Sequence, residues 1–130
     1  MTNVLMVIVF LFAGMNAFAD DYVQLRHEGL AEYEKGHYTH AETLIRQSLD
    51  WAQTTKDEYT IALNYSTLGD ISQAQSRLPE AEQAYRKAIF IISQKPESYR
   101  ALAILWRNLA SALTSQSRFD DASAALNEAR

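Results

Sequence analysis

The stretch that decides the fold is residues 62–92, ALNYSTLGDISQAQSRLPEAEQAYRKAIFII. Its first half carries small and apolar residues at helical spacing, and its second half does so again after a short break. The residues that set the two patterns are Ala62, Tyr65, Leu68 and Gly69, then Ala81, Tyr85, Ala88 and Ile89. The stretch therefore predicts two helices that pack antiparallel against each other.

The same arrangement returns on both sides of this stretch. Ala41, Ala81 and Ala122 are 40 and 41 residues apart. Small residues recur at the same two spacings at a second position, at Gly29, Gly69 and Ala110. Because self-similarity at a fixed period indicates stacked units, the chain is predicted to hold three helix pairs, at about residues 22–57, 58–96 and 97–130.

Small residues let two helix backbones approach closely, and large apolar residues then fill the space around them. The residues predicted to do so are Leu25, Leu44, Ile45, Leu49, Tyr65, Tyr85, Ile89, Trp106, Leu109, Leu113, Phe119 and Leu126. Truncation of Trp106 to alanine should cost about 3–5 kcal/mol if its ring is buried.

This pattern resembles the tetratricopeptide repeat over roughly residues 22–130. The resemblance implies an all-α protein, an α-solenoid of three antiparallel helix pairs wound into a right-handed superhelix. The period exceeds the usual ~34 residues, as in the longer, kinesin-light-chain-like variety. One departure is that only the first unit keeps the turn glycine, Gly36, which Ser76 and Ser117 replace.

Composition excludes several classes of function. The chain has 130 residues, enough for one small domain, and a net charge of −4. Its 12 basic residues are scattered among 16 acidic ones, whereas a nucleic-acid surface needs clustered cations. The absence of cysteine excludes disulfides, thiolate metal sites and cysteine nucleophiles.

Residues 4–19 carry no charge and end in Ala17, Phe18 and Ala19, with small residues at the two positions that a signal peptidase recognises. We therefore expect a signal peptide at residues 1–19, cleaved after Ala19, and a periplasmic or secreted mature chain. It would touch a membrane only during export. The alternative is an uncleaved anchor, although the apolar run is shorter than the ~20 residues that span a bilayer.

Helix boundaries follow from turn and capping residues. Residues 54–57 are predicted to be a polar connector, and Thr55 with Glu58 three residues later forms a capping-box pattern. Pro79 suits a first helical turn, where its missing N–H is not needed, and Pro96 marks the start of the third pair.

The sequence gives little support for catalysis. It contains no Gly-x-Ser-x-Gly elbow and no Ser-x-x-Lys motif, and no histidine lies in a triad context. His37 and His40 could face one metal ion, with His27 and Glu34 nearby in sequence, but spacing fixes no third ligand. We therefore expect no enzyme activity, no cofactor and no metal.

The surface expected to act is the face of each first helix opposite the core. By resemblance these faces form a concave groove that holds a protein or peptide segment. The predicted groove residues are Arg26, Leu30, Tyr33, Ser66, Asp70, Gln73, Arg107, Asn108 and Ser111. Their mixed character suits a hydrogen-bonded peptide with one or two acidic anchors, because arginine forks match carboxylates. The alternative is that they are merely solvated polar residues.

One specialisation of the family can be tested against these positions. Relatives that grip a C-terminal carboxylate use two asparagines and three cations at set places in the groove. Those places hold Arg26, Leu30, Thr67, Ile104 and Asn108 here, and only Arg26 suits the role. The sequence therefore argues against that carboxylate clamp.

The sequence thus predicts a non-catalytic interaction scaffold in the bacterial envelope. The alternative is that it is the repeat region of a longer protein whose effector or enzyme domain lies beyond Arg130. A second copy of the chain is a further candidate partner, because the last helix pair is expected to leave an apolar face uncapped.

Overall fold

The computed structural model describes residues 21–130, apart from the side chain of Pro96. The predicted signal peptide, residues 1–19, lies outside the described residues. Residues 21–34 are helical. The helices that follow are α2 (Tyr38–Thr55), α3 (Glu58–Ala74), α4 (Leu78–Ile92), the short 3₁₀ helix η1 (Pro96–Ser98), α5 (Tyr99–Ser115) and α6 (Phe119–Glu128). Residues 21–130 contain no strand, so this part of the chain is all-α.

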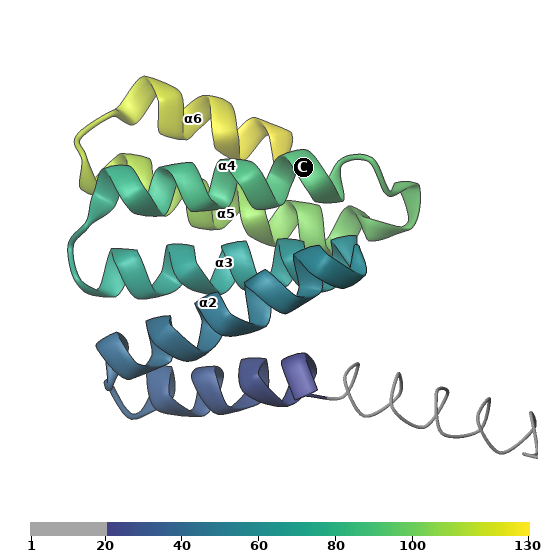
Figure 1. The fold of residues 1–130 in the computed structure, drawn as a ribbon. Helices are drawn as coiled ribbons and strands as arrows, with labels where there is room; N and C mark the ends of the chain where they lie inside the picture. Colours follow the sequence, from purple (N-terminus) through teal and green to yellow (C-terminus); the bar gives the residue numbers. More distant parts are fainter. Residues whose placement is uncertain (1–20) are drawn as a thin grey trace, which may run out of the picture.

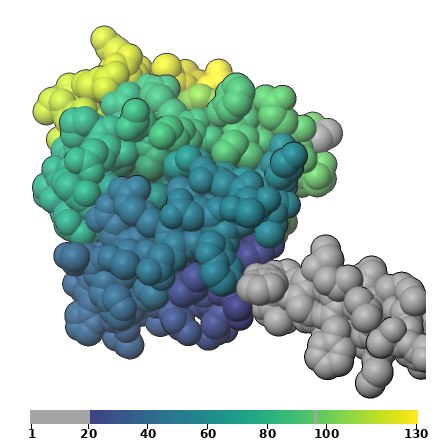
Figure 2. Space-filling model, in the orientation of Figure 1, coloured from purple at the N-terminus to yellow at the C-terminus, as the bar shows by residue number. Residues whose placement is uncertain are grey.

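The helices stack in chain order, with residues 21–34 at one end and α6 at the other (Figure 1). Each helix from α2 to α6 packs against the next, and α3 also contacts α5. The space-filling view shows the same succession along the body (Figure 2). No helix in residues 21–130 is both long enough and apolar enough to cross a bilayer.

The turn inside each helix pair has the same backbone form. Gly36, Ser76 and Ser117 occupy the left-handed region, with φ values of 81°, 59° and 59°. In each turn the next residue's N–H donates to the carbonyl oxygen five residues back, at 2.9, 2.8 and 3.0 Å. This is the Schellman arrangement that usually favours glycine. The two serines therefore replace glycine without a change of turn.

The predicted small residues lie where helices approach most closely. A Cβ added to Gly69 would lie 2.5 Å from Cε1 of Tyr85, and one added to Gly29 would lie 2.7 Å from Cδ1 of Ile45. Tyr85 and Ile45 are both fully buried. The glycines thus provide the room that these two core side chains occupy.

Arginines at the starts of α4 and α6 tie neighbouring helix pairs together. The guanidinium of Arg77 binds Glu42 of the preceding pair at 2.7 Å, and that of Arg118 binds Glu82 at 2.5 Å. Both arginines and both glutamates recur at the spacing of the repeat. These contacts form a ladder of ion pairs along the second helices.

The predicted connector at residues 54–57 was wrong in its boundaries. α2 continues through Thr55, whose hydroxyl donates back to the carbonyls of Trp51 and Ala52. The N-cap of α3 is Asp57, which accepts the Thr60 N–H at 3.1 Å. Aspartate caps a helix as well as threonine does, and Thr55 is already engaged in its own helix.

Six of the twelve predicted core residues are less buried than the pattern indicated: Leu25, Leu44, Tyr65 and Trp106 are partly buried, and Phe119 and Leu126 are exposed. Phe119 is 63% exposed and Leu126 47% exposed, whereas Tyr85, at the position equivalent to Leu126, is 1% exposed. The next helix pair covers Tyr85, and no element of the described chain lies over α6. Trp106 packs against the core but is only partly buried, so the loss expected for its alanine variant falls below that of full burial. Self-association through α6 stays a prediction.

The close approach at Gly69 can be tested by adding one methyl group. Gly69→Ala should lower the free energy of unfolding by about 1–3 kcal/mol, because the buried Tyr85 ring would have to move. Gly29→Ala should cost less, because its Cβ meets the flexible end of Ile45. Urea unfolding followed by circular dichroism gives both values. Equal losses, or no loss at Gly69, would contradict this packing.

Candidate functional site

Four of the nine predicted groove residues meet in one hydrogen-bond network around Tyr85. The Tyr85 hydroxyl donates to Asp70 Oδ1 at 2.6 Å and lies 3.1 Å from Gln73 Oε1. Gln73 Nε2 donates to Ser111 Oγ at 2.9 Å, and Asn108 Nδ2 lies 3.5 Å from Asp70 Oδ1. The network joins α3 to α4 and α5, so these side chains hold the helices together as well as facing outward.

Asp70 is a largely covered carboxylate, and no ion pair with it exists among residues 21–130. Burial raises its pKa, and the hydrogen bond from Tyr85 offsets this only in part. Burial and then the charge of Asp70 raise the pKa of the Tyr33 phenol. Burial and then the charge of Asp70 likewise raise the pKa of the Tyr85 phenol, so its hydroxyl remains a hydrogen-bond donor. The Asp70 carboxylate is thus contacted by the Tyr85 hydroxyl and the Asn108 amide, and it has no ion pair within the described residues.

Removal of the Asp70 charge should stabilise the fold at neutral pH. Because its pKa is higher in the folded chain than in the unfolded one, Asp70 penalises the folded state at pH 7, and the penalty vanishes as the pH falls below about 3.9. Asp70→Asn should therefore raise the free energy of unfolding at pH 7 by roughly 1 kcal/mol, the scale of one buried polar group.

Urea titrations of the wild type and Asp70→Asn from pH 3.5 to pH 8 measure this difference. It should be largest at high pH and shrink toward pH 3.5. Asp50→Asn, which removes an exposed carboxylate of α2, controls for the change of net charge. An Asp70→Asn variant that loses stability as the pH rises would contradict the assignment.

The arginines fall into two groups. Those on or just before the second helices are all ion-paired: Arg46, Arg77, Arg86 and Arg118. Arg26, Arg100 and Arg107 lie on the first helices, and within the described residues no ion pair includes them. The first helices therefore carry three arginines that are available to a partner, and outside them Lys87 of α4 and Arg130 also lack an ion pair within the described residues.

Arg26 is the most constrained of these three. Its guanidinium is half-buried, its Nε has no hydrogen-bond partner in the described chain, and burial lowers its pKa. Arginine nevertheless stays charged at neutral pH. The Nε atom is itself covered, so an anionic group would bind Arg26 through the terminal nitrogens of its guanidinium.

Apolar residues run beside these cations. Val23, Leu63 and Ile104 recur at the repeat spacing of 40 and 41 residues, and Val23 and Ile104 count among the exposed large apolar side chains. On α5, Arg100, Ile104 and Arg107 follow helical spacing and share one face. We call the surface formed by Val23, Arg26, Tyr59, Leu63, Ser66, Arg100, Ile104 and Arg107 the arginine face.

The arginine face contains a cleft of about 840 Å³ between the starts of α3 and α5. Tyr59, Leu63, Ala101 and Ile104 supply its apolar lining. None of these four is among the nine predicted groove residues, although the helical pattern also places Leu63 and Ile104 on the outward faces. A signal for them was present, because Leu63 and Ile104 are apolar residues at equivalent positions of a helical face that is otherwise polar.

The remaining predicted residues add less. Leu30 and Ser66 are half-buried on the first helices. The Ser66 hydroxyl makes no hydrogen bond within the described part of the chain. Tyr33 packs beside Tyr38, with ring centroids 5.7 Å apart.

His37 and His40 both contact the carboxylate of Glu32. Nδ1 of His37 and of His40 lie 2.7 and 3.3 Å from Glu32 Oε2, and Lys35 binds the other oxygen at 2.7 Å. Hydrogen bonds from Lys35 and His37 lower the pKa of Glu32 to about 2. No group of three metal-ligating side chains lies together in residues 21–130.

The sequence pattern of the tetratricopeptide repeat family matches residues 59–130, more than half of the chain. The chain belongs to the tetratricopeptide repeat family. Its fold is similar to the crystal structure of the tetratricopeptide repeat domain of Arabidopsis FLU, with a TM-score of 0.80. The alignment covers 86% of this chain and 93% of that one at 18% sequence identity, so it shows the fold alone. A comparison with curated protein sequences gives no match.

Membership of the tetratricopeptide repeat family confirms the predicted α-solenoid of helix pairs. Repeat domains of this kind generally mediate contacts between proteins, and they are typically non-catalytic. The arginine face is one surface of this chain on which unpaired charges and exposed apolar side chains lie together; Phe90 of α4 and Phe119 of α6 are exposed on other helices.

Proposed function

We propose that the chain is a non-catalytic adaptor that binds an acidic peptide or protein segment on its arginine face. The observation that carries this proposal is the division of the arginines. Arg46, Arg77, Arg86 and Arg118, on or just before the second helices, are ion-paired within the chain, and Arg26, Arg100 and Arg107 of the first helices are not.

Charge complementarity selects the kind of partner. The chain has a net charge of −4, yet the eight residues of the arginine face include three unpaired guanidinium groups and no carboxylate; Asp57, Glu58 and Glu97 line the cleft beside them. Guanidinium forks bind carboxylates in a fixed geometry, and a local positive field attracts an acidic segment to an acidic protein. Asp70 lies one helical turn beyond Ser66, but it is largely covered and hydrogen-bonded to Tyr85.

We also propose that the chain acts in the bacterial envelope, in the periplasm or outside the cell. The uncharged residues 4–19 and the small residues Ala17 and Ala19 support export. The 40- and 41-residue spacings further support assignment to the long-period variety of the family.

A matched pair of charge variants tests the binding face. The full chain, exported and carrying a C-terminal affinity tag, is used to capture partners from envelope extract. Arg26→Gln with Arg107→Gln should lose the specific partner, because two of the three unpaired guanidinium groups are removed. Arg46→Gln with Arg86→Gln makes the same change of net charge on the ion-paired side and should retain it.

Captured proteins are compared by quantitative mass spectrometry after circular dichroism shows that both variants remain helical. Capture should also weaken as NaCl is raised, since salt screens exposed charges. Equal recovery with both double variants would place binding away from the arginine face.

A further inference from the structure

The three first helices carry charges of alternating sign. Arg26 lies on residues 21–34, Asp70 on α3 and Arg107 on α5. Arg26 and Arg107 occupy equivalent positions of the repeat, where α3 has Ser66, and Asp70 follows Ser66 by one helical turn. None of the three charges has an ion-pair partner within residues 21–130. The middle helix therefore offers a negative charge between two positive ones.

The two oxygens of the Asp70 carboxylate differ in their contacts. Oδ1 accepts the Tyr85 hydroxyl at 2.6 Å and lies 3.5 Å from Asn108 Nδ2. Oδ2 accepts no hydrogen bond within the described residues, and the covered side-chain atoms that lack a partner there do not include it. Asp70 as a whole is only partly buried. One oxygen is thus fixed by the fold, and the other reaches solvent in a defined orientation.

The fold does not require the charge of Asp70. Its internal contacts use one oxygen as an acceptor, which an asparagine amide also provides. Burial raises the pKa of this carboxyl, so the charged form costs stability at neutral pH. A charge that costs stability and has no ion pair within the described chain is typical of a residue that serves binding.

An aromatic side chain lies near this carboxylate. The charge of Asp70 contributes to the raised pKa of the Tyr33 phenol, so Tyr33 of residues 21–34 is close to Asp70 of α3. Carboxylates bind ammonium and guanidinium groups through charge-assisted hydrogen bonds, and aromatic rings attract the same groups. The surroundings of the open oxygen therefore suit a cation.

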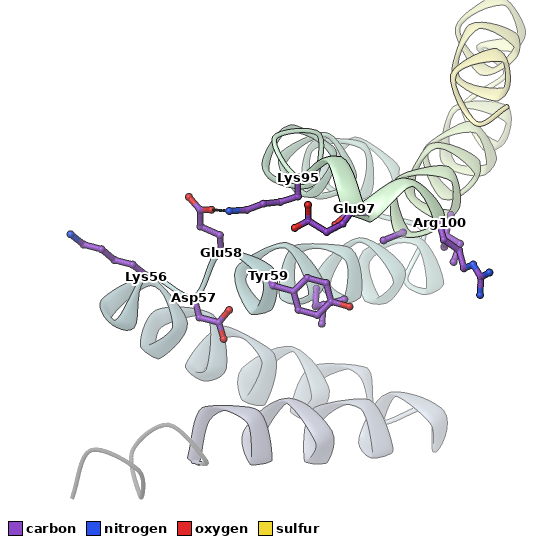
Figure 3. Close-up of a pocket in the computed structure, with 11 residues that line it drawn as sticks. Lys56, Asp57, Glu58, Tyr59, Lys95, Glu97 and Arg100 are labelled. Atoms are coloured by element: carbon purple, nitrogen blue, oxygen red, sulfur yellow. Dashed lines mark ion pairs between the residues drawn. The ribbon is translucent and has the colours of Figure 1, made fainter. Parts of the chain in front are cut away.

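The cleft between the starts of α3 and α5 gives no comparable selection by charge. Its rim has three cations and three carboxylates: Lys56, Lys95 and Arg100, then Asp57, Glu58 and Glu97 (Figure 3). Lys95 Nζ already binds Glu58 Oε2 at 2.6 Å. Selection of a partner by charge is therefore better supported where the unpaired charges of successive first helices alternate.

We propose that Asp70 binds a lysine or arginine side chain of the partner segment, between acidic residues of that segment that are bound by Arg26 and Arg107. The inference rests on the proposed function and adds the order of charges along the segment. Packed helices lie about 8–10 Å apart and an extended chain rises about 3.3 Å per residue, so about three residues separate successive charges. The partner is then an acidic segment with a basic residue between acidic ones.

Two peptides that differ by one acetyl group test this proposal without knowledge of the natural partner. Both are fluorescein-labelled acidic 10-residue peptides with a central lysine and a glutamate three residues to either side. The lysine is free in one peptide and acetylated on Nζ in the other. Binding to the full chain is followed by fluorescence anisotropy. The free-lysine peptide should bind roughly fivefold more tightly, the scale of one partly exposed ion pair. The arginines alone would give the opposite order, because acetylation makes the peptide more negative.

Variants separate Asp70 from the arginines. Asp70→Asn should reduce the preference for free lysine to less than twofold, because an amide cannot form the ion pair. Asp50→Asn removes an exposed carboxylate of α2 with the same change of net charge, and it should leave the preference unchanged. Arg26→Gln with Arg107→Gln should weaken both peptides and preserve the preference. Circular dichroism checks that each variant remains helical.

The outcomes are distinguishable. A preference that is absent from the wild type, or that survives Asp70→Asn, would overturn the Asp70 assignment. Equal weakening of both peptides by Asp70→Asn would show a structural role and would also overturn it. In each of these cases, weaker binding by the double arginine variant still supports the proposed function. Binding that the arginine variant leaves unchanged would refute the proposed function, and absence of binding by both peptides would count against both proposals.

Discussion

The close approach of α3 and α4 at Gly69 is the contact on which much of the structure depends. With no side chain at this position, the Tyr85 ring can lie directly against the α3 backbone in complete burial. The ring then carries its hydroxyl to Asp70, and the Gln73–Ser111 hydrogen bond extends the network to α5. One absent methyl group thus sets the packing of two helices and the position of a carboxylate on the outer face.

The chain separates its charges by task. Glu42 with Arg77 and Glu82 with Arg118 join successive helix pairs along one side, where arginines at the turn reach back to the preceding pair. A single exposed ion pair contributes little to stability. Ion pairs that recur along the ladder favour one arrangement of neighbouring helix pairs. Within the described residues the arginines of the first helices form no ion pair with a carboxylate. The side chains that stack the helix pairs therefore differ from those that we propose to bind a partner.

Much of the fold could be predicted from the sequence because the same packing positions recur in each repeat. The spacing of Gly29, Gly69 and Ala110 predicted the helix pairs, and Ser76 and Ser117 were recognised as turn residues in place of glycine. Burial at the end of the stack was not predictable in the same way. Phe119 and Leu126 share the pattern of covered residues, but their exposure depends on a neighbour and not on their own spacing.

The candidate site was predictable in outline only. Periodicity placed Asp70, Gln73, Asn108 and Ser111 on outward faces, but hydrogen bonds across 38 residues of sequence, such as that from Gln73 to Ser111, have no local signal. The cleft has the same difficulty, since it needs Tyr59 of α3 and Ile104 of α5 together. Unpaired arginines could be identified only once the partners of the other arginines were known.

The central claim is that the unpaired arginines, and not the ion-paired ones, contact the partner. The most direct measurement is NMR detection of arginine side-chain Nε–Hε signals in the ¹⁵N-labelled chain during titration with a synthetic acidic peptide. The account predicts that the shifts concentrate on Arg26, Arg100 and Arg107, with little change at Arg77 and Arg118. Shifts centred on the ladder arginines, with those of the first helices unmoved, would contradict it.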